Sequence, residues 1–243
     1  MSPVDRVAHL NRWRRKSLTE KAVLALGMLL ITLLLPPFPA SVLVAAAMTL
    51  AALAGARVPL KLWLACAAAP TGFLLVGAVS LLVQVSTDGL SLAPDGGRLA
   101  AGLVARSLAG VTCLLFLALT TPVTDLVAGM RRLGLPHEVA EIAHLMYRFI
   151  FLLAETAMAM DTAQAARLGH VSARRRMKSL GMLIANLLPR AFDRARRLET
   201  GLAARGWHGE MRVLSVPSPI SALGLTMVLA VEAGIILFGV LLP

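Results

Sequence analysis

The sequence predicts an all-α polytopic membrane protein with about five transmembrane helices and a cytoplasmic domain of long amphipathic helices. Of its 243 residues, 58% are hydrophobic and only 15% are charged, which is too little charge for the surface of a soluble domain of this size. The apolar residues gather in long runs. The charges are mostly basic, with 24 Lys and Arg against 13 Asp and Glu, and they gather between those runs.

A net charge of +11 is typical either of a nucleic-acid-binding protein or of the cytoplasmic side of a membrane protein. Because apolar runs flank the basic clusters, the sequence favours the membrane protein. We therefore expect the lipid bilayer, and no nucleic acid, as a partner. The basic N-terminus could open a signal peptide, but the small-residue cleavage site is missing and further runs follow. Cys66 and Cys113 lie in apolar runs and are expected to be small buried hydrophobic residues.

Five apolar runs occupy 22–35, 40–56, 60–84, 98–120 and 220–242. At 1.5 Å per residue the last run is about 34 Å long, enough to cross the hydrocarbon core of a bilayer. The first two are short and are separated by Pro36-Pro37-Phe38-Pro39, so they are expected to form a tight helical hairpin whose members need not each cross fully. The third run contains Pro70, which predicts a kinked helix.

The distribution of positive charge predicts the orientation. Basic residues precede the first run and place the N-terminus in the cytoplasm; they are Arg6, Arg12, Arg14, Arg15, Lys16 and Lys21. Arg57 and Lys61 mark the next cytoplasmic loop. The connections 36–39 and 85–97 contain only two acidic residues as charges, which suits the outside. Four crossings therefore return the chain to the cytoplasm at Arg131-Arg132.

The segment from Leu145 to Met160 is apolar but short, and it contains Arg148 and Glu155. If it crossed the membrane, the strongly basic region 167–212 would lie outside, against the positive-inside rule. We therefore expect three parts. They are an N-terminal transmembrane domain (1–136), a cytoplasmic or interfacial domain (137–216) and a C-terminal transmembrane helix (217–243) of a multi-pass protein in the inner (plasma) membrane.

Two amphipathic helices are predicted within 137–216. Apolar residues recur every three or four positions in each; they are Ile142, Met146, Phe149, Leu153, Ala157 and Met160, then Leu180, Leu183, Ile184, Leu187, Leu188, Ala191, Ala195 and Leu198. Arg190, Arg194 and Arg197 line the opposite face of the second helix, which is typical of a helix lying at the membrane surface. A small cytoplasmic bundle is the alternative. Pro189 is expected to kink or divide the second helix, and Pro217 and Pro219 separate it from the last run.

Motifs for catalysis are missing from the sequence. There is no phosphate-binding G-x-x-x-x-G-K-[ST] loop and no compact His or Cys cluster for a metal, and the five histidines are scattered. Asp88-Gly89 and Asp95-Gly96-Gly97 are interpreted as turns, because further carboxylates do not follow. We therefore expect no catalytic, cofactor-binding or metal-binding residues and no enzyme. Glu232, near the middle of the last run, is either a functional acid or a carboxyl group packed against a neighbouring helix.

Two short Ala-Arg segments are the candidate docking sites for a partner. The second is Ala204, Arg205 and Gly206; the first is Ala166 and Arg167, with Gly169 nearby and Leu168 between them. Glycine after the arginine allows a left-handed turn that ends the helix, and small neighbours let a partner approach. A guanidinium then suits carboxylates or helix C-terminal carbonyls in a partner's groove. An ordinary helix cap is the alternative.

The chain resembles the T components of energy-coupling-factor (ECF) transporters, in the family of the cobalt transport protein CbiQ, over nearly its whole length. The segments that carry the resemblance are Asp5-Arg6-Val7-Ala8-His9, Glu20-Lys21, Thr120 to Leu126, Arg131-Arg132-Leu133-Gly134-Leu135-Pro136, Tyr147-Arg148-Phe149, Asp193 to Arg197 and Ala204-Arg205-Gly206-Trp207. The last of these is the most specific. Its order relative to the Arg-Arg-Leu-Gly-Leu-Pro segment adds to the resemblance.

The resemblance implies a non-catalytic coupling subunit of an ATP-driven importer for cobalt or nickel. It implies two ATP-binding cassette ATPase subunits and a substrate-binding membrane (S) component as partners, with Ala166, Arg167 and Gly169 and Ala204, Arg205 and Gly206 at the ATPase-docking sites. Leu168 departs from the family's pattern, because it stands where that pattern has glycine. A stand-alone secondary transporter is the alternative. Such a protein usually has internal repeats and polar residues at mid-membrane depth, whereas this sequence shows no clear repeat and few intramembrane polar residues. A membrane enzyme would need clustered carboxylates or histidines.

Overall fold

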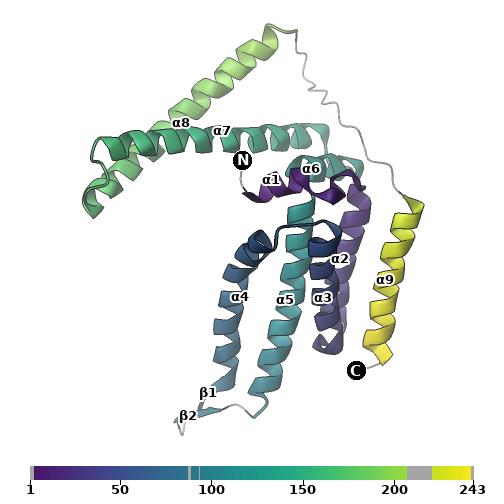
Figure 1. Cartoon of the computed structure of the whole chain (residues 1–243). Coiled ribbons are helices and arrows are strands. Elements are labelled where there is room, and N and C mark those ends of the chain that lie inside the picture. The colour runs from purple at the N-terminus through teal and green to yellow at the C-terminus, as the bar shows by residue number, and fades with distance from the viewer. Residues whose placement is uncertain (1–2, 87–88, 93, 207–220, 242–243) are drawn as a thin grey trace. The chain divides into compact units, whose positions relative to one another are not determined.

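The computed structural model of the chain describes residues 3–86, 89–92, 94–206 and 221–241 (Figure 1). The chain divides into two compact units. Unit 1 comprises Met1–Gly129 and Val216–Pro243, and unit 2 comprises Met130–Ser215. Asp88, Trp207, Pro217 and Pro219, which were part of the sequence predictions, lie outside the described residues.

Unit 1 begins with α1 (Pro3–Leu10), a short 3₁₀ helix η1 (Arg12–Arg15) and α2 (Leu18–Leu34). The hydroxyl of Ser17 caps α2 by accepting a hydrogen bond from the Thr19 N–H at 3.2 Å. Helix α2 ends at Leu34. Its C-cap, Leu35, precedes Pro36, and a proline disfavours helical backbone in the residue before it. The structure thus places a helix on the first predicted apolar run.

The second and third runs also form helices. A helical segment of 19 residues, Pro37–Gly55, comprises η2 (Pro37–Ser41), α3 (Val42–Leu50) and η3 (Ala51–Gly55). Helix α4 (Leu60–Leu82) continues through Pro70. The α4–α5 connection holds two short strands that sequence reasoning missed. They are β1 (Val83–Ser86) and β2 (Gly89–Leu92), which pair antiparallel with Val83 opposite Leu92.

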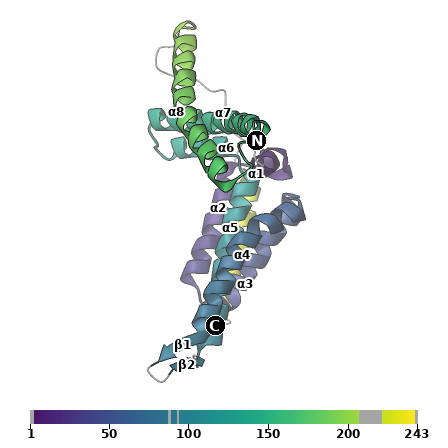
Figure 2. The same cartoon turned by 90° about the vertical axis from the view of Figure 1, so that its left-hand side faces the viewer.

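Helix α5 (Gly96–Thr120) is the centre of unit 1 and contacts α2, α3 and α4 (Figures 1 and 2). Its residues Ala109, Cys113, Phe116 and Leu119 are fully buried and recur at three- and four-residue steps. The ring of Trp13 meets Phe116 edge-on, with centroids 5.4 Å apart. Cys113 is buried as predicted, whereas Cys66 is only partly buried.

Helix α9 (Ala222–Leu241) packs against α2 through glycines that accept large side chains. A Cβ atom at Gly224 would lie 2.7 Å from a carboxylate oxygen of Glu20, and one at Gly27 would overlap the carboxylate of Glu232. Glu20 also accepts a hydrogen bond from the Ser221 N–H at 2.8 Å, which fixes the start of α9. The last apolar run therefore forms a helix over Ala222–Leu241, and this helix packs against α2.

Unit 2 contains two long helices, α7 (His137–Ala166) and α8 (Ala173–Ala203), which follow α6 (Val123–Arg132). The Ser172 hydroxyl caps α8 by accepting from the Arg175 N–H at 3.3 Å. Pro189 lies inside α8 but does not divide it. Many apolar side chains on the two helices are exposed, among them Met146, Ile150, Ile184 and Leu188.

The prediction of an all-α polytopic membrane protein is confirmed. Among the described residues, five helices are long and apolar enough to cross a membrane: Pro37–Gly55, Leu60–Leu82, Gly96–Thr120, His137–Ala166 and Ala222–Leu241. Two differences from the predicted set stand out. Helix α2 has only 17 residues, and α7 reaches the length of a span because it extends well beyond 145–160 at both ends.

Candidate functional site

The first candidate docking tip is the C-terminus of α7. The helix ends at Ala166, and Arg167 caps it. Leu168 then adopts a left-handed backbone with φ of 60°. The Leu168 N–H donates to the Ala165 carbonyl at 3.0 Å, and the Gly169 N–H donates to the Gln164 carbonyl at 2.9 Å. These two bonds make a Schellman motif, which satisfies carbonyls that a helix end otherwise leaves unpaired.

Gly169 holds this turn against the start of α8. A Cβ atom there would lie 2.6 Å from the Ser179 hydroxyl oxygen and 2.8 Å from the Gln164 carbonyl oxygen, so no larger residue fits without movement. The Ser179 hydroxyl donates to the Gly169 carbonyl at 3.3 Å. Near the same turn, His170 lies 3.2 Å from a carboxylate oxygen of Asp161. Gly169 therefore holds the turn that follows Arg167 in close contact with Ser179 of α8.

The second candidate tip is the C-terminus of α8, which ends at Ala203. The Arg205 N–H donates to the Leu202 carbonyl and the Gly206 N–H to the Ala203 carbonyl, both at 3.0 Å. Gly206 has φ of 72°. The left-handed turn that the sequence predicts at this glycine is therefore present.

The two tips share one register. In each, an alanine directly precedes an arginine and a left-handed residue directly follows it, although α7 ends one residue before its arginine and α8 ends two residues before its own. The structural counterpart of Gly206 is thus Leu168 rather than Gly169. The side chains of Arg167 and Arg205 are exposed. Within the part of the chain that the structure describes, no ion pair forms at either guanidinium.

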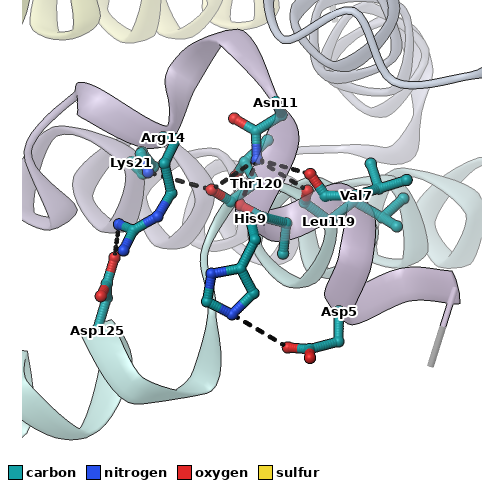
Figure 3. A network of polar contacts seen from close by, with 10 residues as sticks. Asp5, Val7, His9, Asn11, Arg14, Lys21, Leu119, Thr120 and Asp125 are labelled. Carbon is teal, nitrogen blue, oxygen red and sulfur yellow. Dashed lines mark hydrogen bonds and ion pairs between the residues drawn. The ribbon is translucent and has the colours of Figure 1, made fainter. Parts of the chain in front are cut away.

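A polar network in unit 1 joins the N-terminal segment to the end of α5 (Figure 3). The Asn11 side-chain amide donates to the carbonyls of Leu119 at 3.3 Å and Thr120 at 3.2 Å. The Lys21 ammonium donates to the same Thr120 carbonyl at 3.1 Å. Asn11 and Lys21 are both buried, so the network holds the point where α5 ends.

The same network reaches the start of α6. Arg14 forms an ion pair with Asp125, in the first turn of α6 (Figure 3). On α1, His9 lies 3.7 Å from Asp5. Sequence reasoning named these segments as carriers of the family resemblance but did not predict that they meet. Lys21 could have signalled the network, because a lysine at the start of an apolar run needs a partner when it is buried.

Glu232 lies on α9 against Gly27 of α2, as the packed alternative predicted. One of its carboxylate oxygens is buried and has no hydrogen-bond partner among the described residues. The described residues contain no group of three or more His, Cys, Asp and Glu side chains that could hold a metal ion.

Comparison with known proteins gives one consistent family. The family described as cobalt transport protein, CbiQ, matches residues 10–214 of the chain. The cobalt transport protein CbiQ of Rhodobacter capsulatus is 54% identical over 242 residues, covering 100% of this chain and 99% of that protein. The CbiQ of Salmonella typhimurium is 29% identical over 228 residues, covering 88% and 100%. An energy-coupling factor transporter transmembrane protein, EcfT, of Bacillus selenitireducens is 33% identical over 127 residues, 47% of each chain.

Proposed function

The chain belongs to the cobalt transport protein CbiQ family, and on that premise we propose that it is the coupling (T) subunit of an ECF importer. As a member of that family it is a multi-pass membrane component of a transporter. In the proposal it transmits the movement of two ATP-binding cassette ATPase subunits to a separate substrate-binding membrane subunit. The transported ion is cobalt or nickel, and ATP is hydrolysed by the partner subunits.

The observation that carries the proposal is the shared register of the two helix ends. Two helices of 30 and 31 residues are each followed, within two residues of their last one, by an exposed arginine and then a left-handed residue. A left-handed residue ends a third to a half of all helices, so the feature that distinguishes these two ends is the exposed arginine directly before it. The same order of alanine, arginine and left-handed residue at both ends would present one guanidinium to a groove on each of the two ATPase subunits.

The docking sites in the proposal are the tip of α7, with Ala166 and Arg167 backed by Gly169, and the tip of α8, with Ala204, Arg205 and Gly206. Alanines beside each arginine leave room for a partner's backbone. Helices of this length, about 45 Å at 1.5 Å per residue, are suitable levers for transmitting a movement of their ends. Nucleotide can drive such a movement only through contacts that differ between the ATPase states.

The proposed topology places the N-terminus and region 137–216 on the cytoplasmic face of the plasma membrane. Helix α7 is long enough to span, but it carries Arg148, Glu155 and Asp161 along its length. A crossing by α7 would put the many arginines of α8 outside. The exposed apolar residues of α7 and α8 instead fit helices that meet lipid or the substrate-binding subunit from the cytoplasmic side. The parts are again 1–136, 137–216 and 217–243.

Co-purification with the ATPase subunits tests the proposal. The wild-type chain is expected to retain both subunits in detergent, whereas the variant with Arg167→Glu and Arg205→Glu is expected to lose them. Each reversed charge would repel the carboxylates that accept the arginine. The control is Arg174→Glu with Arg176→Glu, which reverses two exposed charges at the other end of α8.

Equal retention by the wild type and by the reversed-tip variant would show that the tips are ordinary helix caps. If the wild-type chain never binds an ATPase, the stand-alone secondary transporter becomes the better account. The double variant must still reach the membrane and elute as a single species, which gel filtration of the purified protein checks.

A further inference from the structure

A groove of about 470 Å³ lies between α7 and α8 in unit 2. Its charged lining is mostly basic, with Arg148 from α7, Arg194 and Arg197 from α8, and Arg205 just after the end of α8. Glu155 is the carboxylate in the lining. Four guanidiniums against one carboxylate leave a net positive groove, which suits an anion that can accept several charge-assisted hydrogen bonds.

The rest of the lining is apolar. Phe149 and Leu152 of α7 face the groove, as do Leu198 and Leu202 of α8. Phe149 directly follows Arg148 and Leu198 directly follows Arg197, so cationic and apolar surface are interleaved along both helices. A small inorganic anion would use only the arginines. A ligand that uses both surfaces must carry an anionic head and an apolar tail.

Gly201 keeps the groove open. It lies in the α8 part of the lining, four residues after Arg197 and four before Arg205, so it shares their face of the helix. A Cβ atom at Gly201 would meet no other atom within 4 Å. A larger side chain at this position would therefore project into the groove.

We propose that this groove binds an anionic phospholipid, with the phosphate held by Arg194 and Arg197 and the start of an acyl chain lying on Phe149, Leu152, Leu198 and Leu202. The argument combines charge complementarity with the interleaved apolar lining. The chain enters unit 2 from α5 and α6 and leaves it towards α9, so both ends of the unit are tethered to helices that can span the membrane.

Native mass spectrometry of the full-length chain in detergent tests the site directly. The probes are dioleoyl-phosphatidylglycerol and its zwitterionic counterpart dioleoyl-phosphatidylcholine, each added at equal concentration. The wild type is expected to retain the anionic lipid preferentially. Arg194→Gln with Arg197→Gln is expected to weaken that binding roughly 30-fold, because each basic side chain near an anionic lipid gives about a fivefold preference.

A second variant separates lost charge from lost space. Gly201→Leu keeps every arginine and places a side chain in the groove, so it is expected to reduce lipid binding as well. Its matched control is Gly181→Leu, also in α8 and also with open space around its Cβ atom, but outside the groove. The charge control is Arg174→Gln with Arg176→Gln. Both controls are expected to bind the anionic lipid as the wild type does.

Three results would overturn the site. Wild-type binding by the Arg194/Arg197 and Gly201 variants would show that the lipid binds elsewhere. Displacement by an equal concentration of glycerol 3-phosphate would assign the groove to small phosphate anions. Displacement by a Glu-rich peptide instead would assign it to an acidic protein partner. No ATPase is present in this assay, so its outcome is independent of the proposed coupling function.

Discussion

At the scale of single residues, the left-handed residue after each arginine sets the direction in which the chain leaves the helix. Gly206 adopts this conformation without cost, whereas Leu168 carries a Cβ atom that is crowded there. Leu168 is 63% exposed, so burial of its side chain offsets little of the cost of the left-handed conformation. The turn exists because the Schellman bonds and the contact of Gly169 with α8 determine it from both sides.

Leu168→Gly is therefore expected to stabilise the chain by about 0.5–1 kcal/mol. It relieves a left-handed penalty of about 1–2 kcal/mol, and the greater freedom of glycine in the unfolded chain offsets part of the gain. Thermal unfolding of the purified protein measures the change. ATPase retention should stay at the wild-type level, since Arg167 keeps its position. Lower stability of the glycine variant would contradict the account of the turn.

At the scale of elements, the network around Thr120 determines where α5 ends and α6 begins. Asn11 and Lys21 both donate to the Thr120 carbonyl, from separate elements, and Thr120, Thr121 and Pro122 are buried. A buried carbonyl without a donor costs about 1–3 kcal/mol. Two donors to one carbonyl can partly replace each other.

A double-mutant cycle of Asn11→Ala and Lys21→Met tests this sharing. Asn11→Ala alone should destabilise the chain by about 2 kcal/mol, because it also releases the Leu119 carbonyl. Lys21→Met should cost less, since methionine fills the same buried space. The double variant should lose about 1 kcal/mol more than the sum, because only then does the Thr120 carbonyl lose both donors. Additive free energies of unfolding would rule out a shared acceptor.

The elements themselves were largely predictable, whereas their pairing was not. Long apolar runs predicted α2, α4, α5 and α9 within a few residues, because hydrophobic length is the main constraint in a bilayer. Pairing of α2 with α9 depends on Gly27 and Gly224 receiving carboxylate side chains, which is a contact between residues some 200 positions apart. The groove is likewise lined by residues of both helices, such as Arg148 of α7 and Arg194 of α8. It could therefore not be predicted from the sequence of either helix alone.

At the scale of the whole molecule, the topology depends on whether α7 crosses the membrane. In a variant with Cys66 and Cys113 replaced by alanine, a single cysteine at Val171 lies in the exposed turn after α7. We expect a membrane-impermeant maleimide to label it only after the cells are permeabilised. A cysteine at Asp95, before α5, is the control on the outer side and should react in intact cells. Labelling of Val171→Cys in intact cells would mean that α7 spans the membrane.

If the chain couples ATP hydrolysis to transport as proposed, the movement of the ATPase subunits shifts the two arginine tips relative to each other. The most direct measurement is the distance between spin labels at Val171→Cys and Ala203→Cys, one beside each tip, in the complex with the ATPase subunits. We expect ATP binding to change the distance distribution in the complex and to leave it unchanged in the isolated chain. An identical distribution with and without ATP, while both ATPase subunits stay bound, would contradict it.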